Sequence, residues 1–373
     1  MGENMNSKLK KLSQTIVEYS LKIKENDRVL ITVQTDKANE LILNLIDDIV
    51  KMKGIPFVRI VDPIINAKLS ELTSLKRIES LKKHSEDDIE NYDCFINIRY
   101  STNDFENMKT SSEINKALSK ATKESDYIRI NERRWVLLNY PSHLDAYKAS
   151  MTSIDYYNYA LDVMNVDYKE MYEMIRPLKE LMEQTDMVRI ISPGTDLTFS
   201  IKNMNVIPCC GEANLPDGEI YTAPIKDSVN GVITYNTKSP YRGDVYENIT
   251  LKFENGKIID ATCNGDNNKL NEIFDTDEGS RYIGEFSLGL NPKITEPMGD
   301  ILFDEKIIGS IHFTPGQAYA DAFNGNNSGI HWDLVLIQRS EYGGGEIYFD
   351  HELIRKDGLF VKPELIHLNY NLK

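Results

Sequence analysis

The chain has 373 residues, of which 41% are hydrophobic and 27% are charged. These proportions are ordinary for a globular protein and exclude a disordered or low-complexity chain, and the length predicts two domains. The net charge of −15 excludes the basic face of a typical nucleic-acid-binding protein, and no stretch approaches the roughly 20 apolar residues of a membrane span.

The first half of the chain alternates helical and strand patterns. Four short apolar runs predict strands: Arg28–Val33, Phe57–Val61, Cys94–Ile98 and Tyr127–Ile130. Helical patterns precede or separate these runs, at residues 9–23, 37–53, 69–83 and 113–123. Asp36 is the expected N-cap of the second helix, and Gly54 its expected end. Strands separated by helices predict an α/β domain with a mainly parallel sheet.

The pattern of the sequence changes near residue 186. Residues 150–185 are helical in pattern and rich in tyrosine, and a strand begins at Val188. Short alternating runs, separated by Gly, Asn and Asp, follow at residues 197–201, 231–235, 248–253 and 257–261. They predict a mainly antiparallel, β-rich (α+β) domain. We therefore expect an α/β domain over residues 1–186 and a β-rich domain over residues 187–373.

Two of the six histidines lie in a glycine-rich stretch of the second half. His312 and His331 are 19 positions apart, and Asp333 follows His331 by two residues. Residues i and i+2 of a strand point to the same side, so His331 and Asp333 can reach one site, which His312 joins from a neighbouring strand. Imidazole and carboxylate are the usual ligands of Zn, Mn, Co or Fe. By spacing alone, each histidine is more often a hydrogen-bonded core residue.

Oxygen ligands are available in the same half. Glu219 follows a Pro-Asp-Gly turn, and Glu285 lies between two glycines. Either is a candidate for the bridging carboxylate that two neighbouring divalent ions need. Tyr319 is a further, less usual candidate. A phenol can become a ligand because a nearby dication favours its deprotonated form. A glutamate after a turn is more often solvated, and a tyrosine in a β domain is more often part of the core.

Several ordered segments of the second half resemble the M29 peptidase family, the thermophilic-type aminopeptidases S and T. These segments are SPGTDLTFSI (192–201), NLPDGEIYTAP (214–224), GEFSLGLNP (284–292), LFDEKIIGSIH (302–312) and NNSGIHWDLV (326–335). The resemblance implies a site for two divalent metal ions (Zn, Co or Mn), a β-rich metal-binding domain after an α/β domain, and a homodimer. The implied ligands are Glu219, Glu285, His312, Tyr319, His331 and Asp333.

The resemblance also implies a metalloaminopeptidase that hydrolyses peptides with a free N-terminus, using water activated by the dinuclear metal. Glu285, Glu305 and Tyr319 are the expected catalytic residues, and either glutamate is a candidate for carrying the proton to the leaving amine. For Glu305, an ion pair with Lys306 is an equally good interpretation. Lys306 is also a candidate for stabilising the oxyanion, and Asp304 for orienting a histidine.

Two other functions fit the same residues. The related dihydroxypyridine ring-opening dioxygenases use a single Fe(II), which needs fewer carboxylates, so the presence of both Glu219 and Glu285 favours two metals. A catalytically silent binding protein on the same fold is the second alternative.

Residues 313–315 (Phe-Thr-Pro) replace the small or aliphatic residues common in the family, so we expect them to reshape the substrate pocket.

The cysteine pattern and the N-terminal sequence bear on location. The four cysteines have no CxxC spacing, which predicts free thiols: Cys94, Cys209, Cys210 and Cys263. The first 25 residues lack a continuous apolar segment, so we expect no signal peptide. The expected location is a reducing cytoplasm, with no nucleic-acid or membrane partner.

Overall fold

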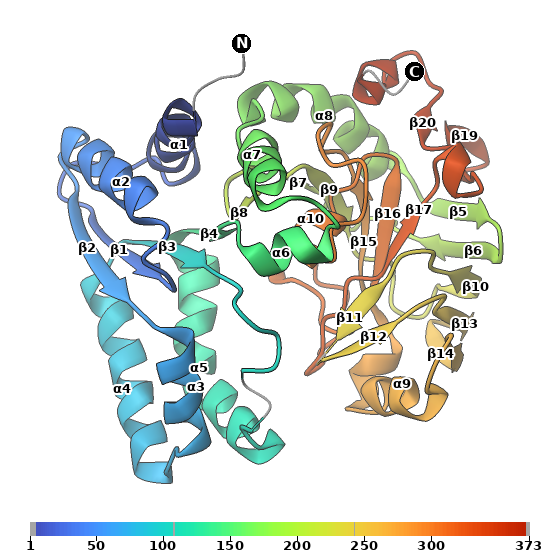
Figure 1. The fold of residues 1–373 in the computed structure, drawn as a ribbon. Coiled ribbons are helices and arrows are strands. Elements are labelled where there is room, and N and C mark those ends of the chain that lie inside the picture. Colours follow the sequence, from blue (N-terminus) through green and yellow to red (C-terminus); the bar gives the residue numbers. More distant parts are fainter. Residues whose placement is uncertain (1–4, 107–108, 242, 371–373) are drawn as a thin grey trace. The chain divides into compact units, whose positions relative to one another are not determined.

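The computed structural model describes residues 5–106, 109–241 and 243–370. The chain divides into two compact units (Figure 1). One unit comprises Met1–Val166 and Gly211–Pro216, and the other comprises Asp167–Cys210 and Asp217–Lys373. The domain ranges expected from the sequence stay a prediction. By contacts, residues 167–186 go with the second unit and residues 211–216 with the first.

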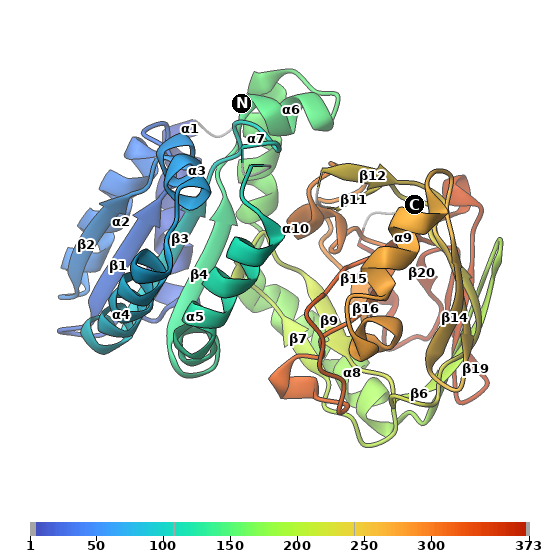
Figure 2. The ribbon, with the colours of Figure 1, turned by 90° about the horizontal axis from the view of Figure 1, so that it is seen from below.

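The first unit is an α/β structure on a five-stranded sheet with the order β2-β1-β3-β4-β8. Its strands are β1 (Arg28–Val33), β2 (Ile55–Ile60), β3 (Cys94–Arg99), β4 (Arg134–Asn139) and β8 (Asn214–Leu215). Its helices are α1 (Met5–Gln14), α2 (Asn39–Lys51), α3 (Pro63–Glu71), α4 (Leu75–Asn91), α5 (Ser112–Glu132), α6 (His143–Lys148) and α7 (Ser153–Met164). All neighbouring strands are parallel, and helices lie on both faces of the sheet (Figure 2). The predicted parallel α/β sheet is confirmed.

One predicted strand of this unit is wrong. Tyr127–Ile130 lies inside α5, and the strand that pairs with β3 is β4 instead. Ile128 packs on a small core cluster around Phe95, whereas Tyr127 and Ile130 are about half exposed. The short apolar run is therefore one turn of an amphipathic helix, which periodicity cannot distinguish from a strand over four residues.

Two helix ends also differ from prediction. The single helix predicted at residues 69–83 is interrupted between α3 and α4, because Ser74 caps the second helix by accepting a hydrogen bond from the N–H of Arg77. Asp36 is not the N-cap of α2. That position belongs to Ala38, which makes no side-chain capping hydrogen bond.

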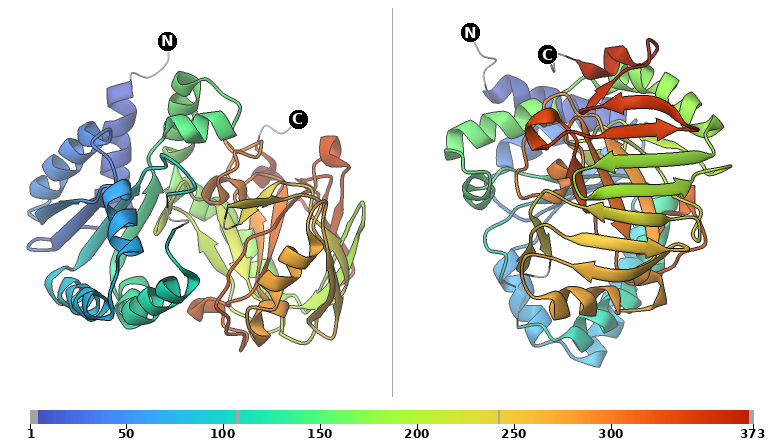
Figure 3. Two further views of the ribbon diagram at one scale, coloured as in Figure 1. Left: turned by 60° about the horizontal axis from the view of Figure 1, so that its bottom comes forward. Right: turned by 90° about the vertical axis from the view of Figure 1, so that its right-hand side faces the viewer.

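The second unit contains two large antiparallel sheets, as the short alternating runs predict. The eight-stranded sheet, seen face on in Figure 3, has the order β14-β13-β10-β6-β5-β18-β19-β20. Its strands are β5 (Met187–Ser192), β6 (Thr195–Ser200), β10 (Asn230–Thr234), β13 (Thr250–Glu254), β14 (Lys257–Thr262), β18 (Glu346–Phe349), β19 (Glu352–Lys356) and β20 (Leu359–Phe360). The five-stranded sheet consists, in order, of β17 (Val335–Ile337), β16 (Ser310–Pro315), β15 (Ile283–Gly289), β9 (Glu219–Thr222) and β7 (Ile207–Cys209).

Three α-helices and a hairpin complete the described part of this unit. They are the helices α8 (Tyr168–Gln184), α9 (Asn267–Phe274) and α10 (Ile301–Asp304) and the hairpin of β11 (Ser239–Tyr241) and β12 (Asp244–Tyr246). Across the described part of the chain, none of the helices has the length and apolarity of a membrane-spanning segment.

A buried aromatic core joins the two sheets of the second unit. The ring of Phe199 in β6 lies 4.9 Å from that of Phe286 in β15 and 5.0 Å from that of Phe313 in β16, measured between centroids. Because side chains alternate along a strand, the residues next to these phenylalanines point to the opposite face of the five-stranded sheet. Phe313 therefore belongs to the core, and the expectation that residues 313–315 reshape a substrate pocket stays a prediction.

Candidate metal centre

Three acidic and imidazole side chains lie on adjacent strands of the five-stranded sheet. Glu219 is on β9, Glu285 on the central strand β15 and His312 on β16. The pairing places Glu219 opposite Gly289, and His312 opposite Ser287. Glu219, Glu285 and His312 are all buried. The strand register therefore brings together residues that are nearly 100 positions apart in the sequence.

The first cluster consists of Glu219, Glu285 and His312. The Nε2 atom of His312 lies 2.9 Å from Oε1 of Glu285 and 3.3 Å from Oε2 of Glu219. One ligand atom from each residue lies within 4.8 Å of the other two, which is close enough for a single metal ion.

The second cluster consists of Glu285, His331 and Asp333. His331 and Asp333 lie in an extended segment just before β17, where His331 forms an isolated bridge with Gly316. The Nε2 atom of His331 is 3.2 Å from Oδ1 of Asp333 and 3.4 Å from Oε2 of Glu285. Glu285 thus faces one histidine with each carboxylate oxygen, and it is the residue common to both clusters.

Hydrogen bonds to backbone carbonyls orient both imidazole rings. Nδ1 of His312 lies 3.1 Å from the carbonyl oxygen of Glu305, and Nδ1 of His331 lies 2.8 Å from that of Gln317. A carbonyl oxygen only accepts, so Nδ1 carries the hydrogen and Nε2 of the neutral ring has a free lone pair. This arrangement is typical of metal-binding histidines.

The Nε2 atoms require a cation. Each faces carboxylate oxygens, which also only accept, so a proton or a metal ion must lie between them. Among the residues that the structure describes, Nε2 of His331 is buried and has no hydrogen-bond partner. Two lone pairs directed at shared carboxylates fit a divalent ion at each histidine.

The pKa shifts of the two histidines and of Asp333 also indicate that the site favours positive charge. Burial alone lowers the pKa of His312, but the charges of Glu219 and Glu285 outweigh it and raise the pKa to about 10. Burial also lowers the pKa of His331. The charge of Asp333 outweighs this effect and holds the pKa of His331 well above its usual value. The pKa of Asp333 is in turn lowered by His331, against the effect of burial. The carboxylates thus stabilise positive charge at both imidazoles.

Comparison with known proteins identifies the family. The family model described as thermophilic metalloprotease (M29) matches residues 5–358. The chain belongs to the M29 family. This assignment confirms the resemblance seen in the ordered segments of the second half.

Relatives of this M29 chain include two proteins of named activity. It is 36% identical to aminopeptidase AmpS of Bacillus subtilis (strain 168) over 155 residues, which are 38% of this chain and 37% of that protein. It is 33% identical to aminopeptidase T of Thermus aquaticus over 151 residues, 37% of this chain and 36% of that protein. The matched part therefore spans less than two fifths of each relative's own length.

Solved structures support the fold. Wild-type AmpT from Thermus thermophilus superposes with a TM-score of 0.80 at 19% identity, covering 96% of the M29 chain and 100% of that chain. The 2,5-dihydroxypyridine dioxygenase from Pseudomonas putida KT2440 superposes with a TM-score of 0.62 at 14% identity, covering 96% and 99%. At these identities the likeness concerns the α/β and β-rich architecture alone.

Two hydroxyl groups that we did not single out from the sequence hold ligand candidates of the M29 chain. Ser287 donates a hydrogen bond to Oε2 of Glu219 at 2.9 Å, and Thr314 donates one to Oδ1 of Asp333 at 2.7 Å. Ser287 follows Glu285 by two residues, so the rule that relates His331 to Asp333 would have found it. Which carboxylate each hydroxyl group contacts, in contrast, depends on strand pairing, which the sequence does not reveal.

A buried charge network surrounds the first cluster. Lys306 is fully buried, donates a hydrogen bond to Glu305 and lies 3.5 Å from Oε1 of Glu219. The predicted ion pair between Glu305 and Lys306 is thus present. Asp304 does not orient a histidine, since its carboxylate accepts hydrogen bonds from the backbone N–H groups of Met298 and Gly299.

Tyr319 lies beside the second cluster. Its ring centroid is 4.7 Å from that of His331 and 5.6 Å from that of Tyr221. Tyr319 is the N-cap of a short 3-10 helix at Ala320–Ala322, and 45% of its surface is exposed. A tyrosine that packs against a ligand candidate while remaining accessible fits the role that the family resemblance implies.

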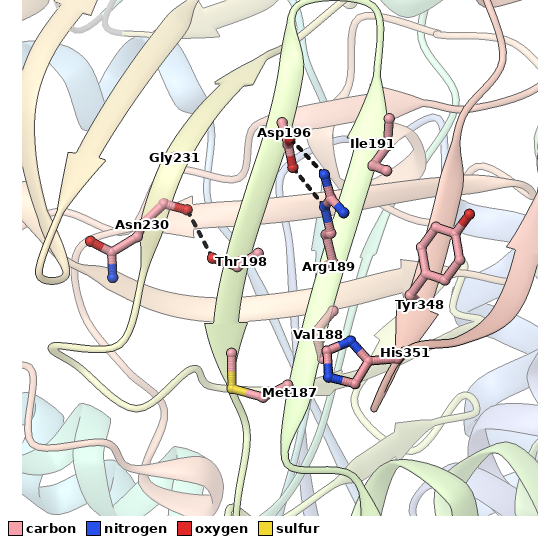
Figure 4. Close-up of a pocket in the computed structure, with 10 residues that line it drawn as sticks. All are labelled: Met187, Val188, Arg189, Ile191, Asp196, Thr198, Asn230, Gly231, Tyr348 and His351. Atoms are coloured by element: carbon pink, nitrogen blue, oxygen red, sulfur yellow. Dashed lines mark hydrogen bonds and ion pairs between the residues drawn. The ribbon is translucent and has the colours of Figure 1, made fainter.

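A larger concavity lies elsewhere, on the outer face of the eight-stranded sheet. It has a volume of about 690 Å³ and is lined by residues of β5, β6, β10 and β18 (Figure 4). Its charged pair, Arg189 and Asp196, is joined at 2.8 Å. None of the six ligand candidates lines it. Size alone therefore does not identify the site of chemistry in this M29 chain.

Proposed function

We propose that the chain is a metalloaminopeptidase that releases N-terminal residues from peptides with a free amino terminus. The observation that carries this proposal is the position of Glu285 between two histidines, one at each of its oxygens. A shared carboxylate of this kind is what a pair of divalent ions needs. Membership of the metalloprotease family and the names of its relatives support the same activity.

The proposed ligands form two sets. Glu219, Glu285 and His312 would hold one ion, and Glu285, His331 and Asp333 the other. Tyr319 is proposed as a further ligand beside His331. Two divalent ions, Zn, Co or Mn, would polarise the scissile carbonyl and lower the pKa of a water molecule towards neutrality.

Glu305 is the proposed carrier of the proton from that water to the leaving amine. Burial raises the pKa of Glu305 to about 8, although the ammonium group of Lys306 acts in the opposite direction. A general base and acid works best with a pKa near the working pH. Glu285, whose two oxygens both face histidines, is better suited to holding the metals.

The dioxygenase alternative differs in metal count. Such a site needs two histidines and one carboxylate for a single Fe(II). Here three buried or partly buried carboxylates, those of Glu219, Glu285 and Asp333, face the two histidines. This surplus of carboxylates favours two ions and hydrolysis.

The first test is an assay of the metal-loaded protein on aminoacyl-anilides. With Co, Zn or Mn the protein should release the aniline, EDTA should abolish this, and metal analysis should find about two ions per chain. His331→Ala should lower the metal content, while His351→Ala, outside both clusters, should leave it unchanged. One iron per chain with no hydrolysis across a broad panel of N-terminal residues would reject the proposal.

Metal binding should release protons. In the metal-free protein the pKa of His312 is about 10, so this ring is protonated near neutral pH and must lose its proton when Nε2 binds an ion. The affinity for Zn should therefore rise as the pH rises from 6 to 8, because fewer protons then compete for the imidazole nitrogen. Calorimetry in two buffers of different ionisation enthalpy measures the proton number, and a value of zero would contradict ligation by the histidines.

The proposal extends to assembly and location. We propose a homodimer, as the family resemblance implies, and light scattering coupled to gel filtration would give the mass in solution. We also propose that the protein works in a reducing cytoplasm, which suits its four free thiols.

A further inference from the structure

A small pocket borders the second cluster. His331 and Asp333 line it on one side, and its apolar walls come from Tyr241, Ile301, Trp332 and Val335. We call this space, of about 140 Å³, the Trp332 pocket. Because it shares two residues with the proposed metal centre, a group held there lies next to the site of chemistry.

The walls of the pocket are preorganised. The Trp332 ring is buried, with its centroid 4.6 Å from that of Tyr241, 5.4 Å from that of Tyr246 and 5.9 Å from that of Phe274. The hydroxyl of Thr237 donates a hydrogen bond to the carbonyl of Val335 at 3.0 Å, which fixes the chain that leads into the β11–β12 hairpin. A rigid apolar wall loses little entropy when a ligand binds.

The size of the pocket limits what it can hold. A cavity of about 150 Å³ is large enough for benzene. The Trp332 pocket is slightly smaller, so it matches a phenyl ring or a branched aliphatic side chain. An indole is larger than this space, and a methyl group leaves most of it unfilled.

The charges around the pocket disfavour ionised side chains. The carboxylate of Asp304 already accepts hydrogen bonds at 2.6 Å and 3.0 Å from two backbone N–H groups, and Asp333 accepts one from Thr314. The ammonium group of Lys238 is paired with Glu247 at 3.2 Å. An acidic side chain would therefore meet the negative charge of Asp333 and a second acidic side chain, Asp304, and a basic one would find both already engaged in hydrogen bonds.

We propose that the Trp332 pocket receives the side chain of the substrate's N-terminal residue and selects leucine, methionine and phenylalanine. Alanine leaves the space unfilled, tryptophan exceeds it, and aspartate and glutamate are repelled. This inference rests on the proposed aminopeptidase function, because the side chain reaches the pocket when the adjoining carbonyl lies at the metal centre. A single methylene changes kcat/KM by roughly 10- to 200-fold in such pockets, so leucine should exceed alanine by at least that lower factor.

Kinetics with a filled and an enlarged pocket test the assignment. Ile301 is 41% exposed, so a larger side chain is accommodated there without repacking the core. Ile301→Trp should lower the ratio of kcat/KM for leucine over alanine anilides by roughly 10-fold or more. Ile301→Ala should raise kcat/KM for the tryptophan anilide. Ile259→Trp is the matched control, since Ile259 is 47% exposed on β14 and lies outside the pocket.

A binding measurement separates this inference from the proposed activity. The chain has two tryptophans, so Trp135→Phe leaves Trp332 as the only indole. Titration of the metal-loaded variant with L-leucinol should change its fluorescence, and titration with L-aspartate should not. No response to L-leucinol, an unchanged leucine-to-alanine ratio in Ile301→Trp, or a wild-type preference for arginine or aspartate would overturn the pocket assignment. A fluorescence response without hydrolysis of any substrate would instead reject the peptidase function.

Discussion

Replacing Glu285 with glutamine should remove both metal ions and nearly all activity. Glutamine keeps the shape of the side chain but loses the charge that faces His312 through Oε1 and His331 through Oε2. Activity should fall by at least about 1,000-fold, equivalent to about 4 kcal/mol of transition-state stabilisation. Metal analysis should fall from about two ions per chain to below one, because each ion loses a ligand.

Because Glu285 belongs to both clusters, its replacement should affect both ions, whereas replacement of a residue in one cluster should affect one ion. His331→Ala should weaken only the ion of the second cluster, so its metal content should stay above that of Glu285→Gln. Glu346→Gln is the control for the change of charge, since Glu346 forms an exposed ion pair with Lys356 at 3.0 Å, away from the metal centre. Retention of both ions by Glu285→Gln would show that the carboxylate does not bridge them.

The sequence predicts the fold well wherever a pattern is long. The alternation of helical and strand patterns predicted the parallel sheet, since strands of this kind are typically continuously apolar because helices cover both faces. The short alternating runs broken by Gly and Asn predicted the antiparallel sheets, since strands buried mainly on one face alternate between apolar and polar residues. The wrong strand at Tyr127–Ile130 shows the limit. Four residues cover about one helical turn, so only neighbours far away in the sequence decide between helix and strand.

The candidate site was only partly predictable from its own residues. The i, i+2 relation of His331 and Asp333 is local, and it places both at one site. Glu219 and Glu285 came from the family resemblance, because their meeting with His312 depends on the register of β9, β15 and β16. Local sequence patterns do not indicate which distant strands pair or in which register. The contact of Lys306 with Glu219 could not be predicted for the same reason, whereas its ion pair with the adjacent Glu305 could.

Lys306 gives the second large expected effect, on stability. Its side chain is fully buried between Glu305 and Glu219. Burial lowers the pKa of Lys306, but the two carboxylates outweigh this and hold it well above the usual value, so the ammonium form is present. Lys306→Met leaves the buried acidic side chains of Glu219 and Glu305 without the cation that faces both. Such a loss costs about 3–5 kcal/mol, a large share of the roughly 5–15 kcal/mol that stabilise a typical protein.

Urea denaturation in EDTA measures this effect without bound metal. Lys356→Met is the control, because it removes the same group from the exposed pair with Glu346 and should change stability little. Equal stabilities of the two variants would contradict a buried ion pair at Lys306. If the loss comes from uncompensated charge, adding Glu305→Gln to Lys306→Met should recover part of it, whereas a loss from packing would persist in the double variant.

The pH dependence distinguishes the same two causes. A carboxyl group with a higher pKa in the folded than in the unfolded protein binds more protons when folded, so stability falls as the pH rises between the two values. The pKa of Glu305 is already about 8, and removing the ammonium group of Lys306, which lowers it, should raise it further. In both folded proteins Glu305 is largely protonated below pH 8, so the destabilisation of Lys306→Met should shrink as the pH is lowered from 10 to 8. A loss that does not change over this range would mean that Lys306 stabilises the protein by filling space and not by its charge.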